Sequence, residues 1–119
     1  MTLLVHTFVY DGKGDWQLLD DPDDGGDMAG FESSRTKLWG SECARALGAR
    51  FLPRLAGDDM FVEPEEVEHF LAECELLRGN TAALGAHSGY GEDYVVARLG
   101  NIERAALRAR AVGGGVLVW

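Results

Sequence analysis

The chain has 119 residues, of which 46% are hydrophobic, and its 20 acidic and 11 basic side chains give a formal charge of −9. This length and composition predict one domain, residues 1–119, with a single hydrophobic core, and they exclude a disordered chain. The negative charge disfavours nucleic acid as a partner and favours a basic protein. No apolar run reaches the roughly 20 residues that span a bilayer. Since no signal peptide is recognisable either, we expect no membrane partner and a cytoplasmic location.

The clearest strand pattern lies at residues 3–10, a nearly continuous apolar run that is rich in β-branched and aromatic side chains. Such a run is typical of a central strand that is covered on at least one face. His6 interrupts the run, and a lone histidine in this position is more often structural than a ligand. Turn residues at 11–14 precede residues 16–19, which could form the second strand of a hairpin.

An acidic, glycine-rich loop follows at residues 20–30. Its aspartates are Asp20, Asp21, Asp23, Asp24 and Asp27. Counted as a calcium loop from Asp21, it has Gly25 where the fifth position needs a ligand, and Pro22 lies between the first two ligands. A solvated loop is therefore favoured over a cation site, and no metal site is predicted.

Three helical patterns follow along the chain. Residues 33–47 predict a helix in two pieces, with a break at residues 40–41, and residues 64–78 predict a helix that begins at Pro64. Residues 92–112 predict the longest helix, because apolar side chains recur there at steps of three and four. These side chains are Val95, Leu99, Ile102, Ala106 and Ala109. Residues 51–55 contain Pro53, so we expect an edge strand or a packed loop there.

Three glycines at residues 113–115 end the longest helix, and residues 116–119 are expected to form a strand that pairs with residues 3–10. The predicted fold class is therefore α+β. It has a small antiparallel or mixed sheet built on the N- and C-terminal strands and covered on one face by about three helices.

No strong catalytic or cofactor motif is present. His87 and Ser88 are adjacent but lack the nucleophile elbow of a serine hydrolase. Cys43 and Cys74 lie on apolar helix faces, where burial explains them better than reactivity. We expect no cofactor, and an enzyme is less favoured than a binding protein.

Two candidate sites remain. The first is a ligand site of stacked aromatic and cationic side chains, Arg35 with Trp39 and Tyr94 with Arg98, for which plain packing at helix edges is the alternative. The second is an acidic surface at the start and outer face of one helix, which the loop at 20–27 would extend. Its members are Glu63, Glu65, Glu66, Glu68 and Glu73.

The layout also resembles a known class of proteins. The segments that carry the resemblance are GFESS at 30–34, LWG at 38–40, FLP at 51–53 and VEPEEV at 62–67, between an N-terminal strand and a C-terminal helix and strand. This order is similar to small bacterial immunity proteins of polymorphic toxin systems, and equally to uncharacterised small proteins of high-GC bacteria. The resemblance implies an α+β fold and a toxin-neutralising role, and it transfers no functional residue.

The predicted function is a small acidic cytoplasmic protein-binding module, in its specific form an immunity-type inhibitor of a basic toxin domain. The alternative is a small ligand-binding domain or enzyme with a pocket near Trp39 and Arg98.

Overall fold

The computed structural model of the protein describes residues 2–19 and 26–119. It contains an antiparallel sheet whose central strand is β1 (Thr2–Tyr10), and the strand order is β2-β1-β5-β4. Strand β5 (Gly115–Val118) pairs with the middle of β1, and β4 (Met60–Val62) pairs with β5. Strands β2 (Trp16–Leu18) and β3 (Met28–Phe31) both pair with β1, β2 near its end and β3 near its start. The predicted pairing between the N-terminal and C-terminal strands is therefore confirmed.

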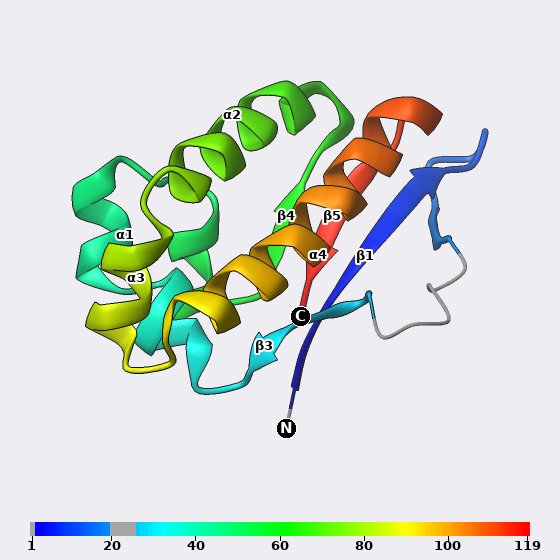
Figure 1. The fold of residues 1–119 in the computed structure, drawn as a ribbon. Coiled ribbons are helices and arrows are strands. Elements are labelled where there is room, and N and C mark those ends of the chain that lie inside the picture. The colour runs from blue at the N-terminus through cyan, green and yellow to red at the C-terminus, as the bar shows by residue number, and fades with distance from the viewer. Residues whose placement is uncertain (1, 20–25) are drawn as a thin grey trace.

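The helices form a second layer on one side of the sheet (Figure 1). Among the described residues, four helices are α-helical, α1 (Glu42–Leu47), α2 (Val67–Arg78), α3 (Thr81–Ser88) and α4 (Glu92–Val112). Three are shorter and of other types, the π-helix η1 (Arg35–Trp39) and the 3-10 helices η2 (Leu52–Ala56) and η3 (Pro64–Glu66). With one sheet and one helical layer in a single compact unit, the predicted α+β class is confirmed.

The long helix α4 packs directly on β1. Val95, Leu99 and Ile102 are fully buried, and Thr7 Oγ1 donates a 2.7 Å hydrogen bond to Ala105 O. Asn101 Nδ2 similarly donates to Met28 O at 2.8 Å. The hydrophobic core therefore lies between α4, the other helices and one face of the sheet.

Glycine allows the C-terminal strand to approach its neighbours this closely. A Cβ on Gly114 would collide with Phe8 O, and one on Gly115 would collide with Val62 O. Any other residue there would push β5 away from β1 or β4.

The segment from η1 to β4 tests two local predictions of the sequence. The break at residues 40–41 is confirmed, because η1 ends at Trp39 and Ser41 Oγ caps α1 by accepting from Ala44 N at 3.2 Å. Residues 52–56 form η2 instead of an edge strand, since Pro53 suits the first turn of a helix. The strand that follows η2 at one edge of the sheet is β4, which has only three residues.

The predicted aspartate cluster falls mainly on residues 20–25, outside the described residues. Within the described ranges, no group of three or more potential metal-ligating side chains is found. No helix in these same ranges is long and apolar enough to cross a membrane.

Candidate functional site: an aromatic sheet face and a polar pocket

The second face of the sheet is mainly apolar, with His6 as an exception. Alternate residues of β1 point away from the helices, and cross-strand partners lie on the same face. Phe8 is opposite Leu18, Tyr10 opposite Trp16, and Leu117 opposite both His6 and Phe61. We call this surface the aromatic face. Its members are Leu4, Phe8, Tyr10, Trp16, Leu18, Phe61, Leu117 and Trp119.

Much of the aromatic face is open to solvent. The exposed fractions are 43% for Tyr10, 41% for Trp16, 37% for Leu18, 38% for Phe61 and 43% for Trp119. An antiparallel sheet with one solvated face normally carries polar side chains there. Contiguous apolar surface on a folded protein instead marks an interaction site.

The rings of the aromatic face are held in fixed relative positions by edge-to-face contacts. The Phe8 ring contacts the rings of Tyr10, Trp16 and Phe61 at centroid distances of 5.4, 6.1 and 5.7 Å. Trp16 and Phe61 also contact each other at 5.8 Å. Because these side chains are already ordered, a partner that covers them loses little side-chain entropy on binding.

The start of η3 places carboxylates beside the aromatic face. Tyr10 Oη donates a 2.6 Å hydrogen bond to Glu63 Oε2. This bond raises the pKa of Tyr10, with smaller contributions in the same direction from desolvation and from the charges of Glu63 and Glu65. One border of the aromatic face is therefore acidic.

The opposite end of the aromatic face opens into a pocket of about 310 Å³. Its lining residues are Thr2, Leu4, Glu32, Arg35, Asp59 and Trp119. Arg35 Nε contacts Glu32 Oε1 at 2.5 Å, and Arg35 Nη2 contacts Asp59 Oδ1 at 2.7 Å. Two carboxylates surround one guanidinium, so this border also carries net negative charge.

The four residues of the predicted ligand site lie in three places. Tyr94 and Arg98 do stack, with the guanidinium carbon 5.2 Å from the ring centroid. Arg35 lines the pocket beside Trp119 instead of stacking on Trp39. Trp39 is fully buried, and its Nε1 donates to Ala29 O at 3.0 Å. Trp39 therefore has no accessible surface that could line a pocket.

The predicted acidic surface is divided as well. Glu65 and Glu68 are exposed, whereas Glu63 and Glu66 are half-buried, with Glu63 N donating to Glu66 Oε1 at 3.1 Å.

The expected exposure of Glu73 was wrong, because its side chain is only 7% exposed. Its carboxylate accepts hydrogen bonds from Arg50 N at 2.5 Å and from Phe51 N and Leu52 N at 2.9 Å. Glu73 therefore satisfies the backbone that leads into η2 and has a structural role.

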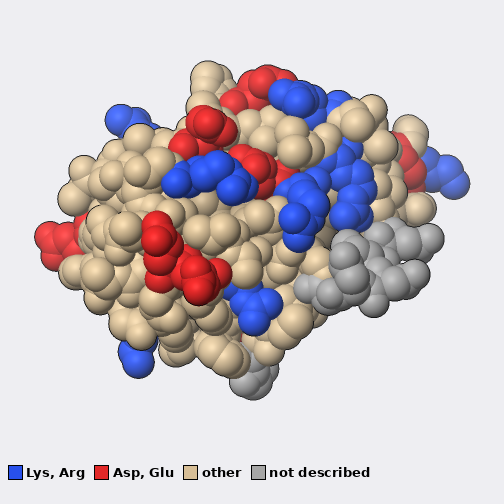
Figure 2. All heavy atoms as spheres, viewed as in Figure 1, with Lys and Arg blue, Asp and Glu red and all other residues tan. Residues whose placement is uncertain are grey.

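Charges on the helical layer are mixed. In Figure 2, acidic and basic side chains are interspersed over the helices, and basic side chains gather over the C-terminal half of α4. This helix carries Arg98, Arg104, Arg108 and Arg110.

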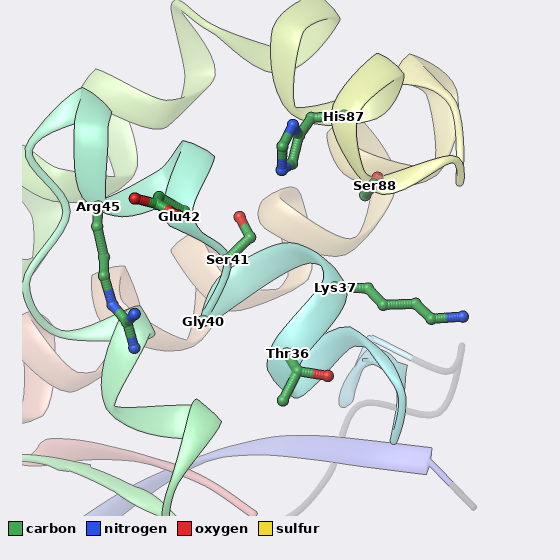
Figure 3. A pocket seen from close by; sticks show the side chains of 8 residues that line it. All are labelled: Thr36, Lys37, Gly40, Ser41, Glu42, Arg45, His87 and Ser88. Atoms are coloured by element: carbon green, nitrogen blue, oxygen red, sulfur yellow. The ribbon is translucent and has the colours of Figure 1, made fainter.

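A second hollow, the polar pocket, has a volume of about 550 Å³ and lies where η1, α1 and α3 meet (Figure 3). Its lining residues are Thr36, Lys37, Gly40, Ser41, Glu42, Arg45, His87 and Ser88. Ser41 Oγ points toward His87 but donates its proton to Leu38 O at 2.7 Å, and Ser88 Oγ donates to Gly85 O at 3.3 Å. Neither hydroxyl donates to His87, so the pocket lacks an activated serine.

Cys74 does not have the environment of a reactive thiol. Both cysteines are free, and burial raises the pKa of the Cys74 thiol to about 12. Cys74 is therefore a small core residue.

Comparison of the chain with models of protein families, with curated proteins and with solved structures found no match.

Proposed function

We propose that this protein is a binding module for a basic protein, which covers the aromatic face and directs basic side chains to its two acidic borders. The observation that carries the proposal is the exposure of five large apolar side chains, three of them Trp or Tyr, on one face of a preordered sheet. Trp and Tyr are enriched among the residues that contribute most to binding energy at protein interfaces.

Charge favours a basic partner over a second copy of the chain. Each copy carries a formal charge of −9, and in a face-to-face dimer the borders at Glu63 and at the Arg35 pocket would bring like charges together. A basic partner would instead be attracted during diffusion and would find carboxylates on both sides of the apolar contact.

An immunity-type inhibitor of a basic toxin domain is the specific form of this proposal, and a cytoplasmic location would suit it. Such a protein needs a preformed surface and an electrostatic match, and it needs no catalytic group.

The test uses site-specific photocrosslinking in the native cell. A benzophenone amino acid replaces Trp16 in one variant, and in the control it replaces Leu107, which is equally exposed on α4. We expect a basic protein to be crosslinked from position 16 only. The double variant Trp16→Ala/Phe61→Ala should weaken its binding in purified form at least tenfold, whereas Val96→Ala/Leu107→Ala should not change it.

Two results would overturn the proposal. One is that both positions capture the same proteins, and the other is that position 16 captures only another copy of this chain. Melting curves of the alanine variants show whether a loss of binding is only a loss of fold.

A further inference from the structure

The polar pocket has more basic than acidic side chains, whereas the chain as a whole is acidic. Three of its residues, Lys37, Arg45 and His87, can carry positive charge, and Glu42 is its single carboxylate. Within the described ranges, Lys37 and Arg45 form no ion pair, whereas Arg35, Arg78 and Arg110 do. Both permanent cations on the wall of this hollow therefore lack a carboxylate partner among the described residues.

The pocket is built from a rare backbone element. Thr36 and Lys37 belong to the π-helix η1, and π-helices occur frequently at functional sites. Gly40 follows η1, and a Cβ there would collide with Arg35 O and with Ala56. This close approach fixes the connection between η1 and α1, residues 40 and 41, which lines the pocket.

The two permanent cations of the pocket come from different elements, Lys37 from η1 and Arg45 from α1. In Figure 3 they lie at the two sides of the labelled group and extend in different directions, and the His87 ring points from α3 toward Ser41. Because both cations line the same hollow and have long flexible side chains, they approach one ligand from opposite sides. A ligand that satisfies both needs two separated acidic groups.

We propose that the polar pocket binds a small organic anion with two separated acidic groups, such as a dicarboxylate. Lys37 and Arg45 each bind one carboxylate by charge-assisted hydrogen bonds, and the Thr36 hydroxyl and the His87 ring supply further polar contacts. The net charge of the chain does not prevent this, because the Debye length of about 8 Å at physiological salt screens distant carboxylates. The proposal is independent of the aromatic face.

The probe is glutarate, compared with butyrate, which is glutarate with one of its two carboxylates replaced by hydrogen. Isotopically labelled protein is titrated and followed by NMR. We expect saturable shifts for glutarate that are confined to η1, the start of α1 and the end of α3, and affinity at least about tenfold higher than for butyrate.

Substitutions test whether Lys37 and Arg45 each bind one carboxylate of the ligand. Lys37→Gln and Arg45→Gln should each weaken glutarate binding at least about tenfold. The matched controls Lys13→Gln and Arg50→Gln remove exposed cations that lie outside the pocket and should leave affinity unchanged. Glu42→Gln removes the one repulsive carboxylate and should strengthen binding.

The proposal is overturned if glutarate gives no saturable shifts at concentrations up to about 10 mM. It is equally overturned if butyrate binds as tightly as glutarate, or if the control variants lose as much affinity as the pocket variants. Because Lys37 and Arg45 are exposed, their replacement should leave the melting temperature unchanged, which separates lost binding from lost fold.

Discussion

Tyr10 Oη and Glu63 Oε2 are joined by a 2.6 Å hydrogen bond that connects the end of the central strand to the residue before η3. The bond orders the Tyr10 ring, which contacts Phe8 in the aromatic face. It also directs a carboxylate to the border of that face. One contact thus joins the two features, apolar surface and negative charge, on which the proposed docking depends.

The first prediction concerns the titration of Tyr10. Glu63→Gln should lower the pKa of Tyr10 toward its ordinary value of 10.0, since the bond to Glu63 is the main cause of its increase. NMR titration of the Tyr10 ring protons measures this. Glu68→Gln, farther along the same helical segment, is the control that should leave the titration unchanged. A Tyr10 pKa that is equal in the parent and in Glu63→Gln would contradict the assignment.

The same bond has a consequence for stability against pH. Because the folded-state pKa of Tyr10 is raised, its contribution to folding is fully present below about pH 10 and is lost as pH rises through the higher folded-state value. Glu63→Gln should reduce this dependence. Chemical denaturation on both sides of pH 10 would detect the difference.

The second prediction concerns Glu73. Glu73→Ala removes the acceptor of three backbone N–H groups and should lower the free energy of unfolding by at least about 2 kcal/mol. Glu75→Ala, an exposed glutamate on the same helix, should stay within about 0.5 kcal/mol of the parent. Urea denaturation gives both values, and equal losses in the two variants would show that Glu73 has no special role.

The third prediction tests the packing of α4 on the sheet. Leu99→Ala should cost about 2–5 kcal/mol, because Leu99 is fully buried. Leu107 lies two turns later on the same helix but is 41% exposed, so Leu107→Ala should cost much less. Thermal unfolding of the pair would refute the packing if the two melting temperatures fell equally.

The fourth prediction concerns the electrostatic part of docking. Glu65→Lys should slow association with the partner of the aromatic face several-fold at low salt, and the effect should fade near physiological salt. Glu65 is preferred to Glu66 for this test, because Glu66 accepts a hydrogen bond from Glu63 N and its replacement would disturb η3. Stopped-flow association measures the rates. Rates that do not depend on salt would exclude electrostatic steering.

Sequence patterns predicted the elements that are long or strongly apolar. The steps of three and four from Val95 to Ala109 identified α4, and the apolar runs at both chain ends identified the pairing of β1 with β5. Strand β4 has only three residues between turns, which is too short for a periodic pattern to be recognised. Its position became evident only through its pairing with β5.

The candidate sites were harder to predict, because they depend on which strands pair. The nearly continuous apolar run in residues 3–10 predicted a strand that is covered on at least one face. It did not predict the contact between Trp16 and Phe61, because these residues come from strands at opposite edges of the sheet. The burial of Glu73 was predictable from its spacing, because it lies three residues after Phe70 and four before Leu77, and both of these side chains are buried. The hydrogen bond of Trp39 to Ala29 was not predictable, because it depends on β3, a strand that no local pattern indicated.

The two free cysteines differ in accessibility, and the rate at which the less accessible one reacts reports how often the folded domain opens. Cys74 is fully buried and its thiol stays protonated at neutral pH, whereas Cys43 is only half-buried. Since the thiolate is the species that reacts, an alkylating reagent reaches Cys74 only through molecules in which α2 has detached from the core. The slow phase of thiol labelling therefore measures how often the domain opens, without any introduced probe.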